Sequence, residues 1–468
     1  MSEISPPPTD TEKPTLRTME SQDLSQVSTQ DSTLVHPPTW RQWPWWWWTS
    51  IAVSYLGLIV IGTNDGTPGV LLPPMKEFYG VDDVRIALVF IFNLIGYLIS
   101  SFLTGWIVEK VGIRIFLGGV NVLYVIATLV NGFGPPFPAL LAMMILIGAA
   151  VAGIDAGYNA YIVRFPNNTV LLNYLHAFYG VGAWIGPLIA TACTVQAGWP
   201  WYRVYFVLCG VSALPLIGVL TVFRSLPADF AVKGDQKDAS AGLETEQEKE
   251  GNVIVLALRV GIVWLCGLMF FVYVGTEVAM GNWSYSLLLS RQHSEYISGW
   301  LVSIYWLGLT MGRVVLGHAA ERVGKMRLIY GSLTLTLAGL FIVWFGRVEP
   351  ALGIGLFIVG FGLGPVFPTA ISCLTDYLPT RIQTTAIGFV AAFSCVGSAV
   401  LNWFGGFLAQ TLGRESLLPY EVILVVIMLG VWGVVHWRGN LLLKRKKEEE
   451  EAASRQGERT AENAGEQC

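Results

Sequence analysis

The chain has 468 residues, of which 53% are hydrophobic and 13% are charged, with a formal net charge of −4. About a quarter of the residues in a soluble globular chain are charged, so most of this chain is expected to lie in a membrane. The sequence contains no nucleotide-binding loop, zinc pattern or nucleophile triad. An ATP-driven pump, a membrane enzyme and a nucleic-acid partner are therefore without support, and no cofactor or metal is expected.

Apolar runs of about 20 residues, the length of a membrane-spanning helix, recur along the whole chain. They begin near Trp46, Ile86, Ile113, Pro138, Leu175, Val204, Val260, Ser298, Arg327, Ala351, Gln383 and Pro419. We therefore predict an all-α membrane protein with twelve transmembrane helices, six in each half.

Three segments lack apolar periodicity, which makes disorder the default expectation. They divide the chain into a tail at 1–42, a six-helix bundle at 43–225, a linker at 226–251, a second bundle at 252–442 and a tail at 443–468. Lys and Arg are concentrated on the side of the tails and the linker, with a cluster at 444–447. Because cytoplasmic loops carry the excess of Lys and Arg, we expect both termini in the cytoplasm and place the chain in the plasma membrane.

Three carboxylates, Asp65, Asp155 and Glu277, fall inside predicted spans. An ionised group there costs at least about 2.5–3.5 kcal/mol, so such residues are usually kept for function. A low dielectric disfavours the charged form, so these groups are suited to bind and release a proton as a cavity opens to either side. We predict proton-coupling roles for them and for His176, the only histidine deep in a predicted span. The alternative is that each only pairs with Arg259, His176 or a helix end.

An internal repeat relates the two halves of the sequence. Gly96, Gly105, Glu109 and Gly112 recur as Gly308, Gly317, Glu321 and Gly324, at an offset of 212 residues (105 to 317). The same offset carries Asp65 onto Glu277. Two parallel halves with acids at matching depths are typical of a secondary transporter whose site lies where the halves meet.

The repeated motif lies between the second and third spans and again between the eighth and ninth. Its residues are Gly105, Glu109, Lys110, Gly112 and Arg114 in the first copy and Gly317, Glu321, Arg322 and Gly324 in the second. Both copies resemble the loop signature of the major facilitator superfamily. This resemblance implies a twelve-helix fold of two parallel halves, a monomer, and a gating role for these residues, whose charges clasp neighbouring helix ends in one access state.

Within that superfamily the chain resembles the fucose permease-like branch of sugar:proton symporters and its fungal relatives. The matching residues are Asn64, Asp65, Leu72 and Pro73, then Asp155 and Asn159, then Asn173 and His176, with Tyr273 to Glu277 and Gly364 to Pro368 in the second half. Asp155 stands where that branch usually has Glu, which changes the reach of the acid. The resemblance implies a proton-coupled transporter of a small organic solute, with a monosaccharide-like cargo as the leading expectation.

We predict that amides and aromatic side chains bind the solute. The candidates are Asn64, Asn159, Asn173, Tyr179, Trp283, Tyr305, Trp306 and Asn402. Amides can donate and accept hydrogen bonds with sugar hydroxyls, and Asn159 lies one helical turn from Asp155 on the same face. Aromatic rings could form a wall for a cyclic solute, although such rings more often serve in packing. Sodium stays open as the coupling ion, because carboxylate and amide oxygens suit it as well.

One motif favours a different function. Gly182, Gly186 and Pro187 in the fifth span resemble a pattern of exporters in the superfamily, although Ala190 replaces the expected last glycine. The alternative prediction is therefore an efflux pump for a hydrophobic metabolite or drug. A nontransporting membrane sensor would use its tails for signalling, and the short low-complexity tails argue against it.

Overall fold

The computed structural model describes residues 43–165, 168–223 and 255–465. The predicted tail at 1–42 and the predicted linker at 226–251 lie outside these residues. All the elements described below are helices.

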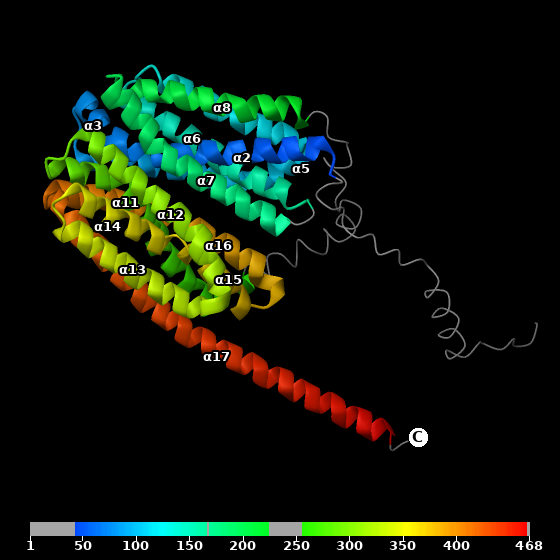
Figure 1. Cartoon of the computed structure of the whole chain (residues 1–468). Helices are drawn as coiled ribbons and strands as arrows, with labels where there is room; N and C mark the ends of the chain where they lie inside the picture. The colour runs from blue at the N-terminus through cyan, green and yellow to red at the C-terminus, as the bar shows by residue number, and fades with distance from the viewer. Residues whose placement is uncertain (1–42, 166–167, 224–254, 466–468) are drawn as a thin grey trace, which may run out of the picture. The chain divides into compact units, whose positions relative to one another are not determined.

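The described part of the first half contains seven α-helices and two short turns of other helix types (Figure 1). They are α2 (Trp45–Gly66), α3 (Pro68–Tyr79), α4 (Asp83–Ile86), α5 (Leu88–Asn131), α6 (Phe137–Ile162), α7 (Asn168–Thr191), the π-helix η2 (Ala192–Gln196), the 3-10 helix η3 (Trp201–Arg203) and α8 (Val204–Thr221). In this half α5 packs against α6 and α8, and α2 packs against α7.

The second half follows the same plan. It contains α11 (Gly261–Ser290), α12 (Glu295–Val323), α13 (Lys325–Phe345), α14 (Glu349–Leu363), α15 (Val366–Tyr377), α16 (Thr380–Thr411), the 3-10 helix η5 (Arg414–Ser416) and α17 (Leu417–Gly465). Here α12 packs against α14, as α5 does against α6, and α11 packs against α16.

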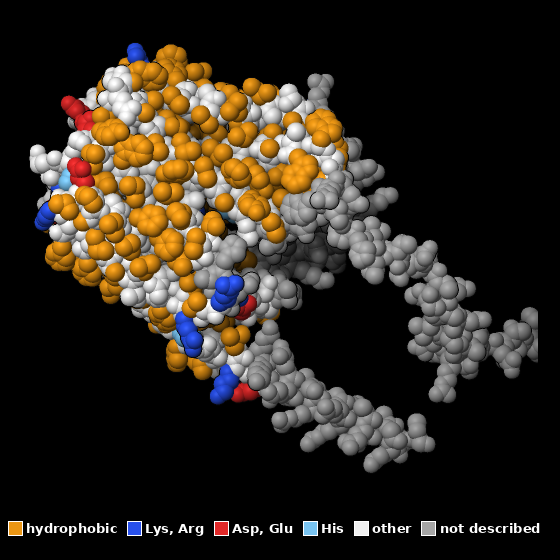
Figure 2. Space-filling view, viewed as in Figure 1, with side chains coloured by type: hydrophobic (Ala, Val, Ile, Leu, Met, Phe, Trp, Pro, Cys, Tyr) orange, Lys and Arg blue, Asp and Glu red, His pale blue; other side chains and the backbone are white. Residues whose placement is uncertain are grey.

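Eleven helical stretches of the described residues are long and apolar enough to cross a membrane. One of them, Asp83–Asn131, is 49 residues long, and its backbone leaves the helical region at Gly112. It therefore holds two of the predicted spans, which confirms the twelve-helix fold. Hydrophobic side chains cover the face seen in Figure 2, and charged side chains lie toward its two ends. This is the surface expected of helices in contact with lipid.

The sequence repeat is also a repeat of backbone geometry. Gly112 has φ 80° and ψ 154°, and Gly324 has φ 91° and ψ 131°, a region open almost only to glycine. Gly96 lies against the Ile145 carbonyl of α6, where a Cβ would collide, and Gly308 lies in the same way against Phe357 of α14. The repeated glycines therefore serve two purposes in each half: a sharp turn and a close helix contact.

Two spans are interrupted, which the sequence pattern did not reveal. Pro68 opens α3 directly after α2, and Pro365 separates α14 from α15. Proline lacks an N–H and its ring clashes with the preceding turn, so it breaks a continuous helix. The Tyr273 hydroxyl of α11 donates to the Leu363 carbonyl beside the second break, at 3.1 Å. Interrupted helices often flank the binding sites of transporters.

The structure differs from the expected disordered tail at 443–468, because α17 continues as a helix to Gly465 (Figure 1). The sequence places Lys444 four residues before Glu448, and further Lys and Glu residues follow at the same spacing. Opposite charges at this spacing stabilise a helix without any apolar face. The charge pattern, rather than an apolar face, accounts for the helix beyond residue 443.

Candidate functional site

The first predicted acid, Asp65, lies at the end of α2 beside the break. Tyr179 of α7 donates a hydrogen bond to its Oδ2 at 3.0 Å, and the Asn64 amide donates to its Oδ1 at 3.1 Å. The Asn64 oxygen in turn accepts from the Tyr124 hydroxyl of α5 at 3.1 Å. Asp65 itself is half-buried. Both carboxylate oxygens are therefore held by side chains of the first half.

The matching acid of the second half, Glu277, forms an ion pair that the sequence analysis missed. Its Oε1 lies 2.7 Å from the guanidinium of Arg313 on α12, with side-chain exposures of 6% and 23% for the acid and the base. Tyr305 donates to the Glu277 backbone carbonyl at 2.7 Å, and Tyr273 lies beside both charged groups. The structural partners expected from the sequence are Arg259, His176 or a helix end, and Arg313 is none of these. The available signal was Arg313 itself, a cation within a predicted apolar span.

The contacts around Asp65 and those around Glu277 are connected across the two halves. The guanidinium carbon of Arg313 lies 5.8 Å from the centre of the Tyr179 ring, whose hydroxyl contacts Asp65. Asp65 and Glu277 are also close enough to interact electrostatically. We call the series Asp65, Tyr179, Arg313 and Glu277 the central relay. It joins α2 and α7 of the first half to α12 and α11 of the second.

Asp155 and Asn159 form a second polar group on α6, next to the central relay. The Asn159 amide donates to the Asp155 carboxylate and to its backbone carbonyl, both at 2.9 Å. Asp155 interacts electrostatically with Asp65 and also with Tyr97 of α5, whose hydroxyl contacts Cys395 of α16. This second acid therefore also lies beside a contact between the halves.

The predicted residues at the start of α7 are accessible. His176 and Asn173 are both exposed, and His176 lies close enough to Arg313 to interact with it electrostatically. The Trp47 ring of α2 contacts Phe165, shortly before α7, with centroids 5.3 Å apart. The exposed part of α7 therefore lies toward the end of the bundle where α2 begins.

At the opposite end, polar contacts join the two halves directly. Asp83 of α4 pairs with Lys76 at 2.7 Å and lies 4.0 Å from Arg414 of the second half. The Val84 amide donates to the side chain of Gln410 on α16 at 3.1 Å. Nearer the middle, Ser303 of α12 donates to the Trp184 carbonyl of α7 at 2.9 Å. We call the group of Lys76, Asp83, Gln410 and Arg414 the closed-end cluster.

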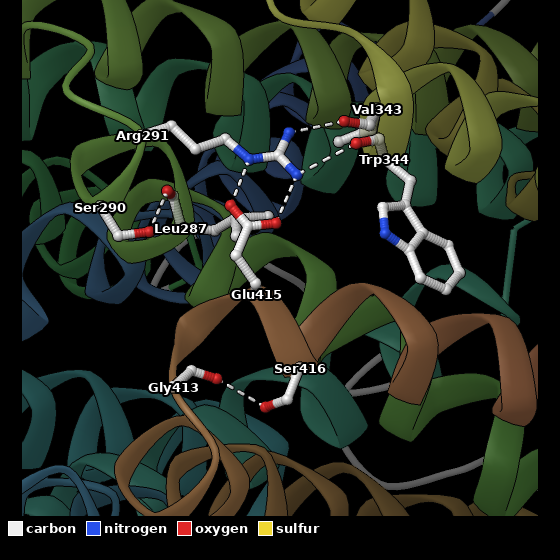
Figure 3. A network of polar contacts seen from close by, with 8 residues as sticks. All are labelled: Leu287, Ser290, Arg291, Val343, Trp344, Gly413, Glu415 and Ser416. Atoms are coloured by element: carbon white, nitrogen blue, oxygen red, sulfur yellow. Dashed lines mark hydrogen bonds and ion pairs between the residues drawn. The ribbon is translucent and has the colours of Figure 1, made fainter.

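An ion pair within the second half holds the loop that carries Arg414. The Arg291 guanidinium contacts both carboxylate oxygens of Glu415 at 2.7 Å and donates to the backbone carbonyls of Val343 and Trp344 (Figure 3). A two-pronged contact of this kind fixes geometry as well as charge. The end of α11, the end of α13 and η5 are therefore tied together next to the closed-end cluster.

The structure does not bring all predicted solute-binding residues to an accessible surface. Trp283, Tyr305, Trp306 and Asn402 are buried, and Trp283 donates to the Asn402 backbone carbonyl at 3.0 Å. Trp306 packs against Gly281 of α11. Their contacts are those of helix packing, so a role in solute binding stays a prediction that this arrangement does not support directly.

The motif residues lie at the turns where α5 bends and α13 begins. Glu109, Lys110 and Arg322 are exposed, and the Lys110 ammonium lies 4.1 Å from the centre of the Trp106 ring. Gly105, Gly317 and Arg114 lie in the same two segments, with open space beside both glycines. The side chain of Glu321 lies outside the described residues. In the second copy, Lys325 reaches Asp376 of α15 at 2.5 Å, a clasp between neighbouring helix ends.

Comparison with known proteins agrees with this architecture. "Bypass of stop codon protein 6" of Saccharomyces cerevisiae is 25% identical over 77% of this chain and 76% of that protein. The "Glucose/mannose transporter GlcP" of Bacillus subtilis is 21% identical over 81% of this chain and 92% of that protein. A solved structure of a "D-xylose-proton symporter" matches with a TM-score of 0.65 at 16% identity, covering 83% of this chain and 97% of that one. Because the sequence model of the Major Facilitator Superfamily matches residues 54–290 and 265–464, the chain belongs to this superfamily of membrane transporters and is not an enzyme.

Proposed function

We propose that the protein is a secondary active transporter that moves a small organic solute by alternating access, coupled to a proton. The observation that carries this proposal is the central relay, which runs from Asp65 to Glu277 and crosses between the halves beside the break between α2 and α3. A group of charges at this position changes its contacts whenever the halves rock against each other. Solute and ion binding there can therefore be coupled to the change of access.

Proton coupling follows from the proximity of the two acids of the first half. Asp65 and Asp155 interact electrostatically, and neither faces a cation as directly as Glu277 faces Arg313. Two carboxylates in one low-dielectric site resist being ionised together, so the site favours the uptake of one proton. Loss of that proton to the other side of the membrane completes a cycle. Asp155 is our first candidate for the coupling group and Asp65 the second.

The proposed cargo is a monosaccharide-like solute. Asn64, Asn159 and Tyr179 place amide and hydroxyl groups beside the two acids, and such groups match the hydroxyls of a sugar. Three acids against one arginine also favour a neutral solute over an anionic one. The resemblance to GlcP, which is named a glucose and mannose transporter, supports the same class of cargo.

The rival proposal, an exporter of hydrophobic compounds, rested on the glycine pattern of α7. A Cβ on Gly182 would collide with the Ile59 carbonyl of α2, and one on Gly186 would meet the Thr63 carbonyl at 2.8 Å. The close packing of α2 on α7 thus accounts for both glycines without reference to transport direction. Sugar uptake therefore remains the leading proposal.

The decisive experiment is solute transport by Asp155→Asn in proteoliposomes. We expect accumulation of a sugar against its gradient to be lost, while exchange at equal concentrations on both sides is retained. The amide keeps the size of the side chain and its hydrogen bonds but binds no proton. Glu349→Gln, at an exposed acid that begins α14, is the matched control and should behave like the wild type. Equal loss of accumulation and exchange in Asp155→Asn would refute the coupling role.

Cargo and coupling ion are identified by one further measurement. Proteoliposomes without an imposed proton gradient are given hexoses, pentoses or hydrophobic metabolites from outside while their internal pH is recorded. Acidification inside with a sugar supports proton symport and names the cargo. Proton movement only with hydrophobic compounds would establish the exporter instead. Uptake of a sugar that requires sodium and moves no proton would replace the proton by sodium as the coupling ion.

A further inference from the structure

A fourth acid within the spans, Glu421 of α17, lies outside the central relay. Its residue is only 2% exposed, and its Oε2 meets no hydrogen-bond donor among the described residues. The side chain borders a small cavity of about 10 Å³ between α11 and α17, lined also by Trp283, Ser284 and Leu418. Such a cavity has room for no more than one water molecule.

The cavity offers Glu421 a hydrogen-bond acceptor but no free side-chain donor. The Trp283 N–H is already donated to the Asn402 carbonyl at 3.0 Å, and the Ser284 hydroxyl is donated to the Met280 carbonyl at 2.5 Å. The Ser284 oxygen can still accept. An ionised carboxylate only accepts hydrogen bonds, whereas a protonated carboxyl group has one to donate. The lining therefore suits the protonated form.

No cation compensates a charge at this position among the described residues. The titratable groups that interact electrostatically with Glu421 are the phenols of Tyr305 on α12 and of Tyr420, its neighbour on α17, and phenols are neutral at physiological pH. Arg414 on η5 faces Asp83 and the Ser286 carbonyl, and Arg291 at the end of α11 is paired with Glu415. A buried carboxylate with neither a cation nor donors is strongly disfavoured, and the group takes up a proton instead.

We propose that Glu421 is a proton-binding site separate from the central relay, occupied when α17 is packed on α11. Its protonated carboxyl group donates a hydrogen bond, through one water molecule in the cavity, to the Ser284 hydroxyl oxygen. The hydroxyl of Tyr305 donates to the Glu277 carbonyl, so the aromatic ring beside Glu421 also contacts the relay. The site is therefore placed to sense movement of α11, although the proposal itself concerns only the bound proton.

Infrared spectroscopy of the full chain in lipid nanodiscs at pH 7 tests this proposal. The wild-type spectrum minus that of Glu421→Gln should contain the carbonyl band of one protonated carboxyl group, identified by its shift in D2O. The matched control is Glu415→Gln, at an acid that is half exposed and paired with Arg291. Its difference spectrum should contain no such band. Absence of the band from the Glu421→Gln difference would overturn the proposal.

A second variant keeps the test informative if Glu421→Gln fails to fold. Ser284→Ala removes the acceptor but leaves the acid, so the same carbonyl band should move to higher frequency as its hydrogen bond is lost. Where Glu421→Gln does fold, raising the pH should lower the apparent melting temperature of the wild type relative to that variant. The reason is that the unfolded chain releases this proton while the folded chain retains it. An unmoved band in Ser284→Ala, or a melting difference that is flat with pH, would argue against the site.

Discussion

The ion pair between Glu277 and Arg313 gives the first prediction at the scale of single residues. Its two groups are largely buried and lie 2.7 Å apart. Removing one partner leaves the other charge uncompensated, so Glu277→Gln and Arg313→Gln should each lower the free energy of unfolding by about 3 kcal/mol, the lower part of the range for broken buried pairs. The double variant should be more stable than the sum of both losses predicts.

The energetic coupling between Glu277 and Arg313 is checked by apparent melting temperatures in nanodiscs. The proteins compared are the wild type, the two single variants and the double variant. Arg313→Lys, which keeps the charge but loses the planar geometry, is the matched control and should fall between the wild type and Arg313→Gln. Strictly additive losses in the double variant would show that the two side chains stabilise the fold independently.

The sequence identified three of the four charged or polar groups of the central relay and missed the fourth. Asp65 and Glu277 stood out because an acid in a span is costly, whereas Tyr179 is among the predicted solute-binding residues. Arg313 was equally costly but lay outside any repeated motif, so it was taken for part of an apolar run. Which acid meets which cation depends on how α11 packs on α12, and spacing along one helix cannot show that.

At the scale of helices, close packing at the repeated glycines gives the second prediction. Gly96→Ala and Gly308→Ala place a methyl group against a backbone carbonyl that cannot move aside. Each should cost about 1–3 kcal/mol, the usual range for overpacking a core. Gly118→Ala and Gly331→Ala are matched controls in open space on α5 and α13. They should instead stabilise their helices by about 0.5–1 kcal/mol.

Thermal unfolding of these four variants separates helix packing from helix propensity. A Gly308→Ala protein that is as stable as Gly331→Ala would contradict the close contact between α12 and α14. Equal losses of stability in Gly96→Ala and Gly308→Ala, by contrast, would agree with the internal repeat. Gly96 and Gly308 make matching contacts and are related by the offset of 212 residues.

Hydrophobicity and length sufficed to predict the twelve spans, because both act on every residue of a helix in lipid. The predicted starts near Val204 and Val260 lie within a residue of α8 and α11, whereas α7 begins at Asn168, seven residues before the predicted Leu175. That first part of α7 mixes Asn168, Thr169 and Asn173 with aliphatic residues, so its hydropathy did not define where the helix begins. The break at Pro68 was not predicted, because the apolar run of about 20 residues from Trp46 ends just before it and says nothing of the helix that follows.

At the scale of the whole molecule, the closed-end cluster should bias the equilibrium between the two access states. Asp83 is largely buried and lies 4.0 Å from Arg414 across the halves, but Arg414 is partly exposed to solvent. Such a pair contributes about 0.5–1 kcal/mol, so Asp83→Asn or Arg414→Gln should shift the populations by about two- to fivefold toward a state that is open at this end. Spin labels at the exposed positions Glu77 and Leu412, in a variant without native cysteines, report the shift as a longer distance component.

The neighbouring pair of Arg291 and Glu415 separates a change of access from a general loss of stability. Both groups belong to the second half, and Arg291 also holds the carbonyls at the end of α13. Arg291→Gln should therefore lower the melting temperature, because it leaves buried carbonyls and an acid without their donor, while the label distances keep their wild-type populations. If Arg291→Gln lengthens the distances as much as Arg414→Gln does, the cluster acts by stiffening the second half rather than by holding the halves together.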